Sequence, residues 1–171
     1  MEKYEFDGLL LKTAFACMAC DQSIHAKEVA HIRQRAKDHQ LFGTIDLEAE
    51  LKRLQFEMND QGYGFFRRFF AEVGSTALSK LQQTQLLKVA IDMVESNEEI
   101  EYAEVKFVKM IRAELDISDE EILASHPNYA EYLKQDVITS AYKEKLASQF
   151  FVGDSFPVLL VPDPLEPRSN N

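Results

Sequence analysis

The sequence has no tryptophan and little cysteine, glycine or proline. Its 171 residues include two cysteines, six glycines and five prolines, and most of the prolines follow residue 156. A chain of this length can bury a core that needs neither a disulfide nor a metal to fold, and we expect both cysteines to be free thiols. Alternating strand patterns are hard to find before the prolines, which argues against a sheet.

Basic residues are also in deficit. Lys and Arg total 19 against 29 Asp and Glu, a formal net charge of −10. Such a charge repels nucleic acid and anionic lipid unless the basic residues are segregated, and Arg33, Arg35, Arg67 and Arg68 stand among acids or aromatics. We therefore expect no nucleic-acid partner. The same charge suits divalent cations or basic partner surfaces.

Long hydrophobic runs are absent as well. The apolar stretch LLLKTAFACMAC is interrupted by Lys12 and is shorter than the roughly 20 residues that a bilayer requires. The first residues, MEKYEFDG, carry three acids and lack the order of a secretion signal, which is a basic stretch followed by an apolar one. We expect a cytoplasmic protein that does not insert into a membrane.

What the sequence does contain is apolar residues at helical spacing. The spacing predicts helices around residues 9–18, 29–36, 46–60, 65–73, 78–94 and 105–115. Ser118 with Glu121 three residues later forms a capping-box pattern and predicts a short helix there, and one or two helices follow around residues 129–142. We predict a single all-α domain over residues 1–171, a bundle of about seven helices. Its helical core spans residues 1–156, and a proline-rich extended tail spans 157–171.

Part of this pattern occurs twice, at an offset of 76 residues. In both copies a long apolar helix runs into a polar turn that holds one isoleucine, and a glutamate follows at the third position of the next helix. The paired positions are Leu10 and Leu86, Leu11 and Leu87, Lys12 and Lys88, Ala14 and Ala90, Ile24 and Ile100, Glu28 and Glu104, and Val29 and Val105. We infer that the bundle consists of two pseudo-repeated helix-turn-helix halves.

The two turns resemble the corner of the tellurite-resistance TerB-like family, which reads roughly Ala-Asp-Gly-x-Ile-x-x-x-Glu. The first copy is CDQSIHAKE over residues 20–28, and the second is SNEEIEYAE over residues 96–104. The resemblance extends from Leu9 to about Leu123. It implies an all-helical bundle with a non-enzymatic role in cytoplasmic stress response or tellurite resistance. It also implies protein partners, some of them membrane-associated.

Each corner has two physical interpretations. A glutamate at the third helical position accepts from free amides of the first turn, so Glu28 and Glu104 can be purely structural. Alternatively, the corners gather hard oxygen ligands of the kind that Ca²⁺ or Mg²⁺ prefers. The candidate metal ligands are Asp21, Glu28, Glu95, Asn97, Glu98 and Glu104. The second corner is the more acidic, although it does not fit the calcium-loop template, since Ile100 takes the glycine position.

Two other functions remain open: a metal-dependent hydrolase that uses the second corner, and a metal-free scaffold that binds protein partners. The sequence shows no nucleophile elbow and no phosphate loop. The CMAC pair of Cys17 and Cys20 lies inside an apolar helix, which favours buried thiols over a redox pair. We expect the four histidines to be solvated and the aromatics of GYGFFRRFF to be core residues, with a docking patch only if Tyr63 and Phe65 are exposed.

Overall fold

The computed structural model describes residues 3–20, 24, 26–39, 41–43, 45–96 and 102–134. This part is all-helical, as predicted, and contains eight α-helices, one more than the expected number of about seven. No helix in it has the length and apolarity of a bilayer-crossing segment. The predicted helices beyond Lys134 and the proline-rich tail at 157–171 lie outside the described residues.

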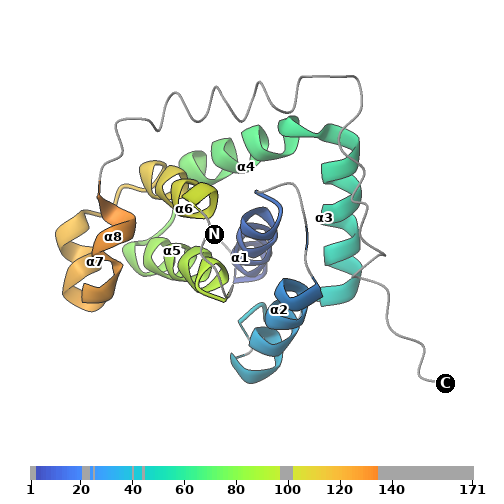
Figure 1. Ribbon diagram of the computed structural model, residues 1–171, viewed down its shortest axis with the longest axis horizontal. Helices are drawn as coiled ribbons and strands as arrows, with labels where there is room; N and C mark the ends of the chain where they lie inside the picture. Colours follow the sequence, from blue (N-terminus) through green and yellow to red (C-terminus); the bar gives the residue numbers. More distant parts are fainter. Residues whose placement is uncertain are drawn as a thin grey trace.

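Helix α1 (Lys3–Met18) lies at the centre of the bundle (Figure 1). It packs chiefly against α5 (Lys80–Val94) and also contacts α3 (Leu47–Gln61), α4 (Tyr63–Ser75) and α6 (Tyr102–Ala113). The apolar residues of its second half are buried all round the helix, as the sequence predicts for a central helix.

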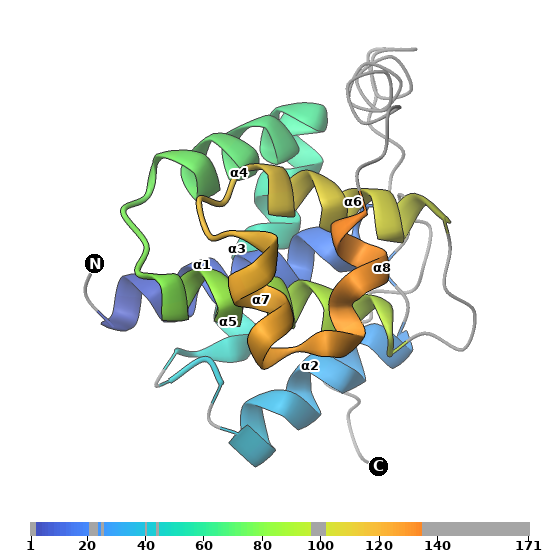
Figure 2. The same ribbon diagram turned by 90° about the vertical axis from the view of Figure 1, so that its left-hand side faces the viewer.

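The remaining elements surround this centre. Helix α2 (Ala26–His39) lies at the edge of the bundle, below α1 and α5 in both ribbon views (Figures 1 and 2). Helix α7 (Asp119–Ser125), the 3₁₀ turn η1 (Pro127–Tyr129) and α8 (Ala130–Leu133) form the side opposite α3 (Figure 1). Helices α1 and α5 pack together and run in the same direction, so the ends from which the chain leads to α2 and to α6 lie on the same side of the bundle (Figure 2).

Local signals fix most helix ends. Ser118 and Glu121 form the predicted capping box at the start of α7, and Ser79 with Gln82 forms a second one at the start of α5. Gly62, at φ 54°, ends α3 and precedes α4, which confirms that GYG interrupts the helices. Helix α1 begins at Lys3, well before the expected start, because Phe6 and Asp7 are buried against the bundle.

The burial pattern supports the inferred duplication. The paired residues that are buried in both copies include Leu10 and Leu86, Leu11 and Leu87, Ala14 and Ala90, Phe15 and Ile91, Met18 and Val94, Glu28 and Glu104, and Ile32 and Val108. Helices α1 and α2 thus present the same faces to the core as α5 and α6, with the conserved offset of 76 residues. The agreement includes two glutamates, which rarely lie in a core.

Candidate functional site

The two corner glutamates occupy equivalent places. Glu28 is the third residue of α2 and Glu104 the third residue of α6, as predicted. Each is only 4% exposed. A carboxylate at this helical position lies near amides that lack an intrahelical partner and near the positive end of the helix dipole, which stabilises its charge.

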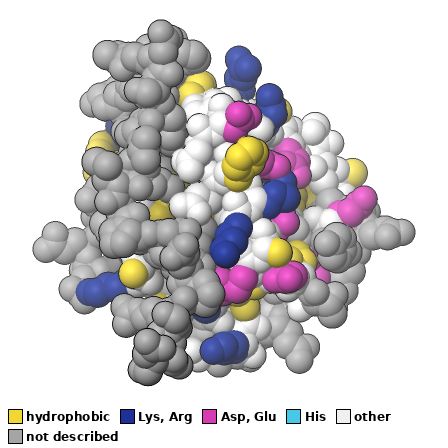
Figure 3. Space-filling view, turned by 90° about the vertical axis from the view of Figure 1, so that its right-hand side faces the viewer, with side chains coloured by type: hydrophobic (Ala, Val, Ile, Leu, Met, Phe, Trp, Pro, Cys, Tyr) yellow, Lys and Arg dark blue, Asp and Glu magenta, His cyan; other side chains and the backbone are white. Residues whose placement is uncertain are grey.

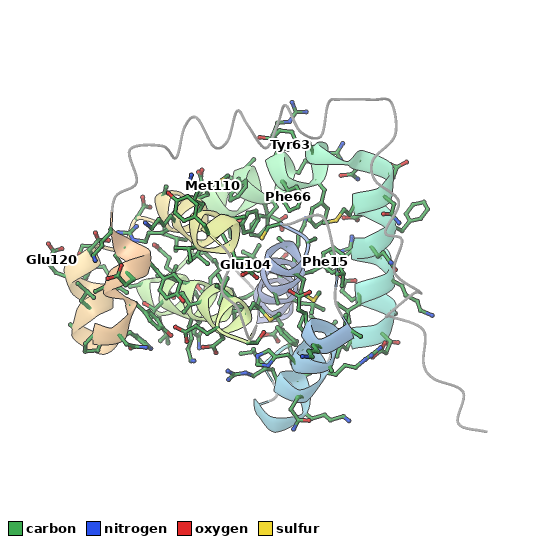
Figure 4. All side chains as sticks on the ribbon, in the orientation of Figure 1. Phe15, Tyr63, Phe66, Glu104, Met110 and Glu120 are labelled. Carbon is green, nitrogen blue, oxygen red and sulfur yellow. The ribbon has the colours of Figure 1, made fainter. Side chains whose placement is uncertain are left out.

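The charges of both glutamates act on the thiol of Cys17 in α1. Burial raises the pKa of the Cys17 thiol, and the negative charges of Glu104 and Glu28 raise it further. Both carboxylates must therefore be close enough to the same sulfur to act on it. Figure 4 shows Glu104 toward the middle of the molecule, beside α1. Glu28 and Glu104 thus influence the same buried residue of the central helix.

A tyrosine that the sequence analysis did not single out joins the second corner. Tyr132 of α8 donates from its hydroxyl to Glu95 Oε1 at 3.2 Å, and Glu95 is the exposed residue that ends α5. Burial, Glu95 and more weakly Glu104 raise the pKa of Tyr132 to about 12. Only the folded chain reveals this, because Glu95 and Tyr132 are 37 residues apart.

Three of the predicted metal ligands are among the described residues: Glu28, Glu95 and Glu104. The other three, Asp21, Asn97 and Glu98, lie outside them. Ile100, the isoleucine of the second corner, also lies outside the described residues. Its counterpart Ile24 is 1% exposed and plugs the core under the first corner, as expected. Within the described ranges no three His, Cys, Asp or Glu side chains are grouped closely enough to hold a metal ion. The full set of six ligands stays a prediction.

Cys17 and Cys20 are free thiols in the core. Both are buried and unbonded to one another, as predicted. A raised pKa keeps the Cys17 thiol protonated at neutral pH, and a protonated thiol is a poor nucleophile.

The aromatic segment after Gly62 forms core rather than a docking surface. Phe65 and Phe66 are each 1% exposed, and Tyr63 is partly buried. The large hydrophobic side chains that are exposed are Phe56, Leu81 and Tyr102, each on a different helix. On the side where α3 lies, Lys and Arg side chains stand among Asp and Glu without forming a patch of their own (Figure 3).

A second polar cluster joins α2 to α5. The guanidinium of Arg35 contacts Asp92 of α5, with 3.2 Å between Nη2 and Oδ2, and its Nε donates to His31 Nε2 at 3.3 Å. These side chains line a narrow pocket whose free volume, about 10 Å³, corresponds to roughly one water position. His31, which we expect from the sequence to be solvated, is instead half-buried here.

Comparisons of the chain with protein-family models, with curated proteins and with solved structures gave no match.

Proposed function

We propose that the protein is a TerB-like, non-enzymatic component of a cytoplasmic stress response that binds a divalent cation, Ca²⁺ or Mg²⁺, at its acidic corners and acts through protein partners. The observation that supports this proposal is the burial of Glu28 and Glu104 at equivalent positions of the two repeats, where each is the third residue of its helix. Carboxylate oxygens at helix corners are ligands of the kind that Ca²⁺ and Mg²⁺ prefer, so a divalent cation is the ligand whose chemistry fits these residues best.

The position of the exposed Glu95 agrees with an entry route for a cation. Glu95 ends α5 at the second corner, and both its carboxylate and that of Glu104 act on Tyr132. A cation arriving from solvent would meet Glu95 first and the buried Glu104 next. Oxygen ligands of this kind suit Ca²⁺ and Mg²⁺.

The hydrolase alternative requires an open cleft at the second corner. One open concavity that described residues line, about 460 Å³ in volume, lies between α1 and α4 and is bordered by Glu5, Glu72 and Thr76. Glu28 and Glu104 are buried in both repeats, which suits a binding role better than a solvent-filled catalytic site.

Isothermal titration of the purified full chain with Ca²⁺ and with Mg²⁺ tests the proposal. We expect binding to the wild type and a loss of affinity of about tenfold or more in Glu28→Gln and in Glu104→Gln, since even indirect partners of a metal ligand contribute about 10- to 100-fold. Glutamine keeps the volume and the capping oxygen but removes the charge.

Glu121→Gln is the matched control for these variants. Glu121 is also the third residue of a helix, where it completes the capping box of α7, and it lies away from both corners. It should bind as the wild type does. If the wild type gives no heat at millimolar cation, or if Glu121→Gln loses affinity as the corner variants do, the cation proposal is wrong.

A further inference from the structure

Among the described residues, ion pairs of Arg33 and Arg35 and a few buried side chains hold α2 on the bundle. Val29 and Ile32 are fully buried, and Arg33 binds Glu48 of α3 through both Nε and Nη2, each at 2.7 Å from a carboxylate oxygen. Arg35 makes the second ion pair, to Asp92 of α5. Helix α2 lies at the edge of the bundle (Figures 1 and 2), so loosening it would leave the central helices in place.

His31 lies within the second of these attachments. An arginine Nε always carries its hydrogen, so it can only donate. Its partner at 3.3 Å, His31 Nε2, must therefore be the unprotonated, accepting nitrogen of a neutral imidazole. The hydrogen bond and the ion pair share one guanidinium, so the ring helps to orient Arg35 toward Asp92.

The groups around His31 come from three elements. On its own helix, Arg35 disfavours a second positive charge. From α5, Asp92 favours such a charge, but Asp92 is also bound by Lys88 Nζ at 2.9 Å. From η1, Tyr129 is neutral, because burial and the charges of Asp92 and Glu95 raise its pKa to about 12, against a smaller opposing effect of Arg35. The apolar residues that border the same pocket are Ala14, Ile32, Leu41, Phe42, Val89 and Met93.

We propose that His31 is an acid-sensitive latch, which holds α2 against α5 while its ring is neutral and releases α2 when Nε2 takes up a proton. Protonation turns the acceptor that faces Arg35 into a donor and adds a positive charge next to Arg35, while Arg35 and Lys88 already share the carboxylate of Asp92. The ring must then turn away or Arg35 must leave the carboxylate. This device needs no cation and goes beyond the proposed function.

The direction of the pH effect follows from linkage. Burial and Arg35 lower the pKa of His31 from its ordinary value of 6.5, against a smaller opposing effect of Asp92. The released state therefore takes up the proton more readily than the docked state. Docking is strongest above about pH 6.5 and weakens as the pH falls below it toward the lowered pKa.

Amide hydrogen exchange of the full chain, read by NMR as protection factors, tests the latch between pH 7.5 and pH 5.5. In the wild type, the protection of α2 amides should fall on acidification, by no more than about tenfold for each pH unit, the limit for one proton. Amides of α5 should keep their protection over the same range.

His31→Gln should abolish the pH dependence of α2 while keeping its protection at pH 7.5, because the glutamine oxygen can accept from Arg35 and does not titrate. His126→Gln is the matched control, since His126 lies at the end of α7 and stacks on Tyr129 without contacting Arg35. It should behave as the wild type. The latch is wrong if α2 protection in the wild type does not change relative to α5, or if His31→Gln retains the pH dependence.

Discussion

At the scale of single residues, two glycines with opposite roles show where the backbone is constrained. Gly43 adopts φ +59°, and a Cβ placed on it would collide with Asp7 Oδ2. Gly8 lies inside α1, and nothing would touch a Cβ placed there. The same change from glycine to alanine should therefore have opposite effects at the two positions.

Gly43→Ala should lower the free energy of unfolding by about 1–2 kcal/mol, the cost of a left-handed backbone for a residue with a side chain. Gly8→Ala should raise it by about 0.5–1 kcal/mol, because alanine is the better helix former. Urea unfolding followed by circular dichroism measures both. Equal effects of the two substitutions would show that the 41–45 turn does not need glycine.

A second residue-scale feature is the guanidinium of Arg112, which fastens the segment between α6 and α7. Arg112 donates to the carbonyl oxygens of Leu115 and Ile117 at 3.0 and 2.6 Å. Its Nε and Nη2 also bind Asp119 Oδ1. Lysine has one point charge and cannot reproduce this fork.

Arg112→Lys should cost about 2 kcal/mol of unfolding free energy, since hydrogen bonds to charged groups contribute about 1.5–3 kcal/mol each and lysine can recover part of them. Arg53→Lys is the control with the same chemistry. Arg53 pairs with Glu50 and Glu57 on the outer face of α3. It should change stability by less than about 0.5 kcal/mol. A comparable loss at both positions, measured by urea unfolding, would contradict the role given to Arg112.

At the scale of elements, the sequence correctly predicted those helix boundaries that depend on residues close together in the chain. The capping box of Ser118 and Glu121, the interruption at Gly62 and the third-position glutamates of α2 and α6 all depend on neighbours within a few residues. The early start of α1 was missed, because the burial of Phe6 and Asp7 depends on the rest of the bundle.

The candidate site was predictable only in part for the same reason. The repeated glutamates could be found from their spacing, and their burial agrees with their repetition. No pattern in the sequence indicates that the charges of both glutamates act on Cys17, or that His31, Arg35 and Asp92 share one pocket. These groupings depend on how α1 and α2 pack on α5, which no local pattern encodes.

At the scale of the whole molecule, one aromatic cluster ties the two halves together. Phe107 of α6 lies against Phe66, Phe69 and Phe70 of α4, with ring centroids 5.6, 6.3 and 5.3 Å away. Phe66 packs edge-to-face on Phe65, and Phe65 packs edge-to-face on Phe15 of α1. Phe66 and Phe15 are labelled in Figure 4. Such pairs contribute about 0.5–1.5 kcal/mol beyond their buried area.

Because Phe107 connects α4 to the second half and is 1% exposed, Phe107→Ala should destabilise the whole fold by about 3–5 kcal/mol. Phe107→Leu, which keeps most of the volume, should cost less than half as much. Phe56→Ala removes a ring that is 71% exposed on α3 and should change stability by less than about 0.5 kcal/mol.

Thermal unfolding, followed at a backbone and an aromatic wavelength, should show one shared transition in each variant if the two halves unfold as a unit. Two separated transitions in the wild type, or equal effects of Phe107→Ala and Phe56→Ala, would mean that the aromatic cluster does not join the halves.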